Sequence, residues 1–152
     1  MKTIKTYLQV LIFFKFVLIS HTIFSQENPT LESVKATLDL AASRYDAGDY
    51  QRAIEYGLKG LDDAGKLEDD QLALIFKSVL GNSYLELDQY KEATNYFLEI
   101  VIEANQRNNS AVAADGYYAL ANVYTEMGAF NRSAETYKKA VDLFRQMGDE
   151  EK

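Results

Sequence analysis

The stretch AGDYQRAIEYGLKGL at residues 47–61 decides the fold, because the chain repeats its pattern twice. The later copies are LDQYKEATNYFLEIV at 87–101 and MGAFNRSAETYKKAV at 127–141. In each copy an aromatic residue is followed three positions later by a small one: Tyr50 and Ala53, Tyr90 and Ala93, Phe130 and Ser133. Three copies in phase, at a spacing of forty residues, indicate an array of structural repeats.

A second helical stretch precedes each copy: LDLAASRY at 38–45, VLGNSYLEL at 79–87 and ALANVYTEM at 119–127. The connections between successive stretches are short, which favours antiparallel packing of neighbouring helices. We therefore predict an all-α fold, an α-solenoid of three antiparallel helix pairs.

Capping residues indicate where the helices begin and end. Asn28 is the expected N-cap of the first helix, because Pro29 is tolerated in a first turn. Asp49 is the expected cap of the second helix, and the three glycines Gly48, Gly128 and Gly148 are expected to end helices. The later helices are predicted at 50–64, 70–87, 90–106, 110–127 and 130–147.

This repeated pattern resembles the tetratricopeptide repeat, in its longer forty-residue form, over residues 31–149. The repeats would cover 31–69, 70–109 and 110–149, within a domain of residues 26–152. The resemblance implies a right-handed superhelix whose inner wall is built from the first helix of each pair. It also implies a protein–protein interaction module that binds a peptide or protein in its concave groove.

Small residues are expected where the two helices of a pair cross. Ala41, Gly81 and Ala121 would meet Ala53, Ala93 and Ser133. Large residues would fill the space beside these crossings: Leu40, Leu80, Leu120, Tyr84, Tyr124, Phe97 and Tyr137. The first repeat departs from this pattern at Arg44, Gly57 and Gly60, which predicts looser packing of the first helix pair.

Positions at i, i+4, i+7 and i+8 along the first helices share the face that would line the groove. Asn82 and Asn122 are the sharpest candidates, because an amide both donates to and accepts from the backbone of an extended peptide. A hydrogen bond inside the array is the alternative role for both. The candidate groove residues are Leu38, Ala42, Tyr45, Asp46, Ser78, Asn82, Leu85, Glu86, Tyr118, Asn122, Thr125 and Glu126.

The charge of this wall narrows the choice of ligand. Four acidic residues, Asp46, Glu86, Asp115 and Glu126, are expected on or beside it, against Lys35 alone. The basic clamp with which some tetratricopeptide proteins grip an acidic C-terminus is absent, since its places hold Leu38, Asp39, Val79 and Ala119. Complementary charge therefore predicts a neutral or basic extended partner.

The N-terminal residues 1–25 are a different kind of sequence. A basic start, MKTIK, precedes the apolar stretch VLIFFKFVLI and a small residue, Ser25. This order predicts a secretory signal peptide cleaved after Ser25, and so a periplasmic or secreted protein. A retained anchor is the alternative, although Lys15 would cost about 2.5 to 3.5 kcal/mol at the centre of a membrane span.

Removing this segment leaves 13 of the 16 basic residues against 23 acidic ones, a net charge of −10. Nucleic acid and anionic membrane surfaces are then unlikely partners, because they would be repelled. The segment also contains His21, the sole histidine, and the chain has no cysteine. Without these residues or a phosphate-binding loop, we predict no catalytic residues, no metal site and no cofactor.

Two functions remain open. The first is an exported interaction module. The second is a sensory input region, at the N-terminal side of a longer signalling protein such as a membrane-bound sensor kinase or regulator. The last helix bears on this choice, because Tyr137, Val141 and Phe144 are expected to be partly uncovered. Either further repeats or another subunit would cover them.

Overall fold

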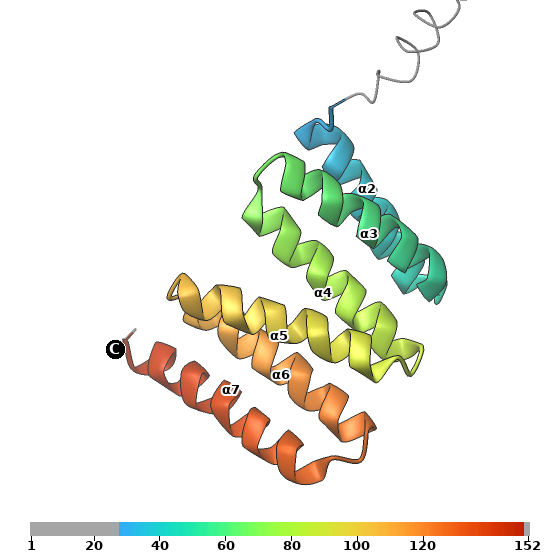
Figure 1. The fold of residues 1–152 in the computed structure, drawn as a ribbon. Coiled ribbons are helices and arrows are strands. Elements are labelled where there is room, and N and C mark those ends of the chain that lie inside the picture. The colour runs from blue at the N-terminus through green and yellow to red at the C-terminus, as the bar shows by residue number, and fades with distance from the viewer. Residues whose placement is uncertain (1–27, 151–152) are drawn as a thin grey trace, which may run out of the picture.

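The computed structural model describes residues 28–150 of the chain, and the side chains of residues 28–148. Within that part the chain forms helices joined by short turns, arranged as three antiparallel pairs stacked in sequence order (Figure 1). This confirms the predicted all-α solenoid. The helices are α2 (Leu31–Asp46), α3 (Tyr50–Lys66), α4 (Asp70–Glu86), α5 (Tyr90–Gln106), α6 (Ser110–Glu126) and α7 (Phe130–Glu150). The signal peptide predicted at residues 1–25 lies outside the described residues.

The turns between helices use a left-handed residue every twenty positions. Gly48 and Gly128 have φ of +74° and +71° there, as expected for glycines that end helices. Glu68, Asp88 and Asn108 occupy the same place with φ between 54° and 58°. The prediction for Gly148 is wrong, because α7 continues through it to Glu150. Gly148 keeps a negative φ and so makes no left-handed turn. As a glycine it only lowers the helix propensity at that position.

The helix starts show which caps operate. The N-cap of α2 is Thr30 and not Asn28, because the Thr30 hydroxyl accepts from the Ser33 amide at 3.1 Å while Ser33 Oγ accepts from the Thr30 amide at 3.0 Å. This reciprocal capping box sets the start of the helix. Asp49 caps α3 as predicted, by accepting from the Arg52 amide.

Within each pair the predicted small residues lie at the crossing and are buried. Ser133 Oγ donates to the Ala121 carbonyl at 3.0 Å, which links α7 directly to α6. At Gly81 the ring of Phe97 fills the space that a side chain would need, since an added Cβ would lie 2.7 Å from Phe97 Cζ. Gly81 therefore allows close approach of α4 and α5, as predicted, with Phe97 as the group that approaches.

At the interfaces between helix pairs, a glycine of one helix faces a large side chain of the next, and the helix that carries the glycine changes from one interface to the other. Gly60 of α3 receives the Phe76 ring of α4, and forty residues later Ile100 of α5 packs on Gly116 of α6. Gly57 likewise receives Leu80. Neither glycine therefore leaves a gap toward the second pair, because Leu80 and Phe76 of α4 fill the two places.

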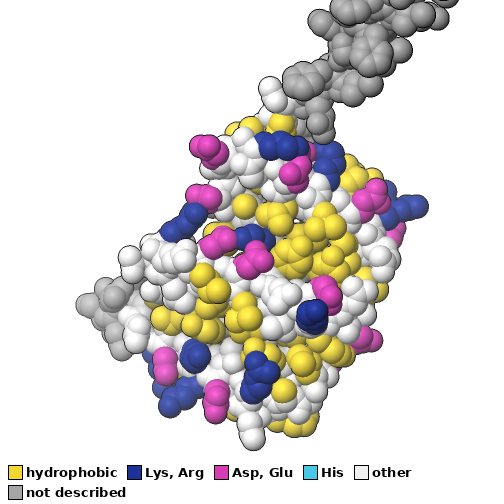
Figure 2. All heavy atoms as spheres, in the orientation of Figure 1, with side chains coloured by type: hydrophobic (Ala, Val, Ile, Leu, Met, Phe, Trp, Pro, Cys, Tyr) yellow, Lys and Arg dark blue, Asp and Glu magenta, His cyan; other side chains and the backbone are white. Residues whose placement is uncertain are grey.

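The two ends of the array are less covered than its middle. Leu40 is 44% exposed whereas Leu80 and Leu120 are buried, because no described helix precedes α2. At the other end Val141 and Phe144 are 42% and 44% exposed, as predicted. The residues at the matching places of α5, Val101 and Ala104, are buried because α6 covers them. Charged side chains of both signs lie around apolar side chains that gather over α3 and α4 on the face in Figure 2.

Candidate functional site

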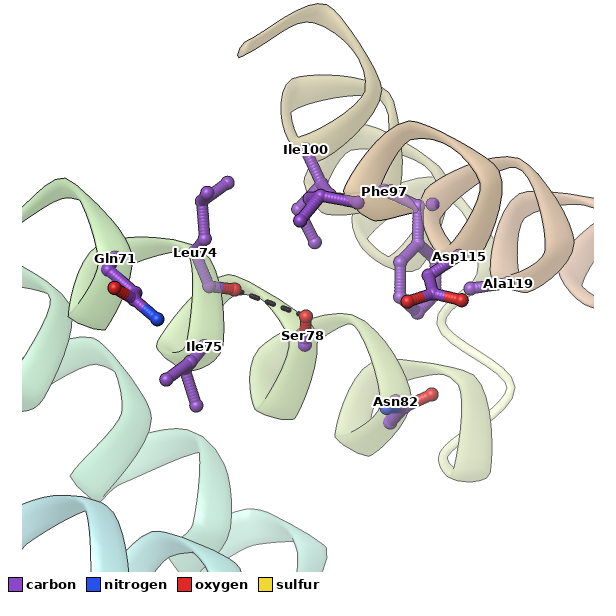
Figure 3. Close-up of a pocket in the computed structure, with 11 residues that line it drawn as sticks. Gln71, Leu74, Ile75, Ser78, Asn82, Phe97, Ile100, Asp115 and Ala119 are labelled. Atoms are coloured by element: carbon purple, nitrogen blue, oxygen red, sulfur yellow. Dashed lines mark hydrogen bonds between the residues drawn. The ribbon is translucent and has the colours of Figure 1, made fainter. Parts of the chain in front are cut away.

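A hollow of about 330 Å³ opens between α4 and α6, with α5 behind it (Figure 3). Phe97 and Ile100 of α5 form its apolar floor. One wall comes from α4 and the other from α6, so the hollow lies on the first helices of the second and third repeats. The lining residues of the walls are Gln71, Leu74, Ile75, Ser78 and Asn82 on α4, and Val112, Asp115, Gly116 and Ala119 on α6.

Asn82 is an open polar group of this hollow, as are Gln71 and Asp115. Its side chain lines the cavity and forms no hydrogen bond with another described residue. The Ser78 hydroxyl, one turn earlier, already has a partner, because it donates to the Leu74 carbonyl at 3.1 Å. Asn82 therefore presents a free donor and a free acceptor above an apolar floor.

Asn122, its counterpart in the third repeat, has a different environment. The Tyr137 hydroxyl of α7 donates to Asn122 Oδ1, and the Tyr137 ring lies edge-on to Tyr118 at 5.5 Å between centroids. Thr125 also contacts α7, because its hydroxyl lies 2.7 Å from Ser133 Oγ. Tyr118, Asn122 and Thr125 are thus engaged with α7, and the predicted two-residue asparagine ladder has one open member.

A second hollow, of about 280 Å³, lies at the C-terminal ends of α4 and α6. Leu85, Glu86, Asp88 and Glu126 line it, so that three of the predicted groove residues meet here. Asp88 also accepts a hydrogen bond of 2.7 Å from the Tyr90 hydroxyl. We call Asp46, Glu86, Asp88 and Glu126 the acidic edge. Three of its members, Asp46, Glu86 and Glu126, occupy the same position of successive repeats.

The first repeat supports this edge through Tyr45 and Tyr50, whose ring centroids lie 5.5 Å apart. Burial, and next the Glu86 carboxylate, raise the pKa of Tyr45, and the same two causes raise the pKa of Tyr50. Of the other candidates in this repeat, Leu38 packs against the buried cluster around Val34, while Asp46 is exposed.

Lys77 fixes α4 to α5 on another face of α4. Its side chain is only 11% exposed and pairs with Glu99 at 3.1 Å and with Glu103. Burial lowers the pKa of Lys77, but hydrogen bonds to Glu103 and Glu99 raise it by more, so the pKa lies above its ordinary value. Lys77 therefore stays charged and holds the wall that carries Asn82 in place.

Sequence reasoning missed most of the apolar lining of the first hollow. Gln71, Leu74 and Ile75 lie one and two turns before Ser78, so extending the same stripe toward the helix start would have found them. Ile100 and Val112 carried no comparable signal. Ile100 packs on Gly116, a contact that the absence of a side chain at Gly116 allows.

The described residues contain no group of three or more His, Cys, Asp or Glu side chains placed to hold a metal ion. None of the helices between residues 28 and 150 has the length and apolar character needed to cross a membrane. What the site offers is an open amide, apolar surface and carboxylates, the groups with which a protein surface binds another chain.

The comparisons with known proteins bear on the fold. No curated protein matches the sequence. A family model for the tetratricopeptide repeat matches residues 114–151. Among solved structures, the TPR domain of Arabidopsis FLU superimposes with a TM-score of 0.72 at 19% identity, over 78% of this chain and 99% of that one. Residues 114–151 are thus similar to a tetratricopeptide repeat in sequence, and the chain has the fold of tetratricopeptide-repeat domains, which are in general non-catalytic protein-interaction modules.

Proposed function

We propose that this chain is an exported interaction module that binds an extended, neutral to basic peptide segment of a partner protein in the hollow between α4 and α6. The observation that carries the proposal is the open Asn82 amide above the floor of Phe97 and Ile100. An extended peptide leaves backbone N–H and C=O groups unpaired, and an amide side chain satisfies one of each.

The test begins with capture of partners from cell-envelope extracts by the full chain, identified by mass spectrometry and confirmed by titration with the purified partner. Asn82→Ala is expected to weaken binding roughly tenfold, as loss of one or two buried hydrogen bonds does. Asn95→Ala is the matched control, because Asn95 is exposed on α5 and does not line the hollow. Unchanged affinity in Asn82→Ala would reject binding in this groove.

Export is a separate part of the proposal and rests on the order of charge and hydropathy in residues 1–25. The processed protein is expected in the periplasm or medium with Gln26 as its first residue. N-terminal sequencing of the fractionated protein decides between cleavage and anchoring, since an intact Met1 in the membrane fraction would contradict export as a free protein.

A sensory input region of a longer signalling protein is the second candidate. The observation that favours it is the uncovered apolar surface of α7 at Val141 and Phe144, where a further helix of a repeat array would pack. A reading frame that continues into more repeats and a transmembrane helix would support this candidate. A stop codon after Lys152 would remove it.

A further inference from the structure

The first hollow and two members of the acidic edge, Glu86 and Glu126, lie on the same helices, and together they specify a partner more narrowly than a peptide groove does. The apolar hollow occupies the middle of α4 and α6, while Glu86 and Glu126 stand at the C-terminal ends of the same two helices. A peptide that follows the groove toward those ends therefore passes from an apolar surface to a charged one. This inference rests on the proposed function.

The middle of the groove suits an apolar side chain. Phe97 and Ile100 form the floor, and Leu74, Ile75 and Val112 add apolar surface around it. A cavity of about 330 Å³ has room for a leucine or phenylalanine side chain. Burial of such a side chain would remove its apolar surface from water and so favour binding.

The acidic edge suits a cation. The two hollows are lined by four carboxylates, those of Asp115, Glu86, Asp88 and Glu126, and no lysine or arginine is among their lining residues. Tyr45 and Tyr50 of the neighbouring repeat, whose ring centroids lie 5.5 Å apart, add aromatic surface, and the Glu86 carboxylate contributes to the raised pKa of both. Carboxylates beside aromatic rings favour an ammonium or guanidinium group, through charge and through the ring faces.

The distance between these two places sets the spacing in the ligand. Ser78 in the first hollow and Glu86 in the second are eight residues apart on α4. At a rise of about 1.5 Å per residue this corresponds to roughly 12 Å along the helix. An extended peptide advances about 3.3 Å per residue and so covers that distance in three to four residues.

From this juxtaposition we infer that the partner segment carries a large apolar residue and, three or four positions from it, a lysine or arginine. The apolar side chain occupies the hollow over Phe97 and Ile100, and the basic side chain reaches Glu86 and Glu126. The segment between them runs past Asn82, which bonds its backbone. The groove thus selects its partner by the spacing of one apolar and one basic residue.

The experiment is a selection from a library of random twelve-residue peptides by the full chain, followed by titration of synthetic peptides. The designed probe is a glycine- and serine-rich peptide with leucine and arginine four positions apart. Comparison peptides carry glutamate in place of arginine, or place the arginine next to the leucine. Glu86→Gln with Glu126→Gln is the test variant, and Glu135→Gln with Glu55→Gln is the control, since both of those residues are exposed on second helices.

Enrichment of the spaced apolar and basic pair is the expected result. The designed probe should bind at least about tenfold more tightly than either comparison peptide, lose that advantage in the double Gln variant, and keep it in the control. Its affinity should also fall with added salt.

Peptides enriched with dependence on Asn82 but without a basic preference would overturn this inference and leave the proposed function standing. If the double Gln variant binds the designed probe with the affinity of the control variant, the inference is likewise overturned and the proposed function stands. If no peptide is enriched over an unrelated protein, both the inference and the proposed function fail.

Discussion

At the scale of single residues, the interfaces between helix pairs depend on which side carries the glycine. Gly60 receives Phe76, whereas Ile100 packs on Gly116 at the matching places of the next repeat. Gly60→Ala is expected to destabilise the protein by about 1 to 3 kcal/mol, because the new methyl group would overlap with the Phe76 ring. Urea denaturation followed by circular dichroism measures the free energy of unfolding.

Gly65→Ala is the matched control, on the same helix and with nothing within 4 Å of the added carbon. It should stabilise the protein by about 0.4 to 1 kcal/mol, because alanine loses less backbone entropy on folding. The same chemical change is thus expected to have opposite signs at two positions of α3. Equal effects would contradict the packing of Phe76 against Gly60.

Asp63 makes a pH-dependent contribution to stability. Its hydrogen bond with Lys59 at 2.6 Å, and next that with Lys66 at 3.1 Å, lower the pKa of Asp63 despite an opposing effect of burial. A lowered carboxyl pKa adds stability above the pKa of the unfolded chain, and this is lost as the pH falls through the folded pKa.

Asp63→Asn should therefore melt below the parent protein at pH 7, and the gap should narrow below about pH 4. Thermal melts at several pH values measure this. Asp62→Asn is the control, because Asp62 is 69% exposed. A gap for Asp63→Asn that is independent of pH would show that the carboxylate charge is not the cause.

At the scale of helices, the start of α2 provides a direct test of capping. Thr30→Ala removes the hydroxyl that accepts from the Ser33 amide and should cost about 0.5 to 2 kcal/mol. Asn28→Ala should have no measurable effect, although its place before Pro29 made it the cap expected from sequence. Hydrogen exchange of the Ser33 amide reports the loss locally. Faster exchange in Asn28→Ala than in Thr30→Ala would show that the cap is Asn28.

Helix positions were predictable because each repeat carries the same periodic pattern, and three copies fix the phase of the six helices between residues 28 and 150. The ends were predictable where a turn demands a left-handed residue, as at Gly48 and Gly128. Gly148 misled because no such turn follows it, and composition alone does not distinguish a stop from a weak helical position. Leu40 misled because burial at its position depends on a helix before it, which repeat periodicity does not reveal.

At the scale of the whole molecule, the groove was predicted in outline and missed in detail. The rule that first helices form the inner wall brought Ser78 and Asn82 to the hollow and Glu86 and Glu126 to the acidic edge. It left open whether Asn122 would form a hydrogen bond inside the array, and the reach of the Tyr137 side chain from α7 to α6 decides that it does. The rule could not foresee that Ile100 would join Phe97 in the apolar floor, because Ile100 packs across the pair interface on Gly116.

The stacked arrangement also predicts which helices unfold when a buried residue is replaced. Each helix packs mainly on its neighbours in sequence, so stability is close to a sum of local terms. Val34 of α2 is buried at the first end of the array, whereas Leu80 of α4 is buried between the first and second pairs. Val34→Asp should abolish amide protection in α2 and α3 and leave α5 to α7 protected. Leu80→Asp should reduce protection throughout residues 28–150, because α4 joins the first pair to the rest.

Hydrogen exchange with mass spectrometry resolves these helices separately, and a buried aspartate makes both substitutions severe by the same mechanism. The comparison therefore isolates position in the array. Uniform loss of protection in Val34→Asp would mean that the helices unfold as one unit and that terminal repeats are coupled to the groove. Local loss in that variant would leave the hollow between α4 and α6 intact, so a peptide that binds there should retain its affinity.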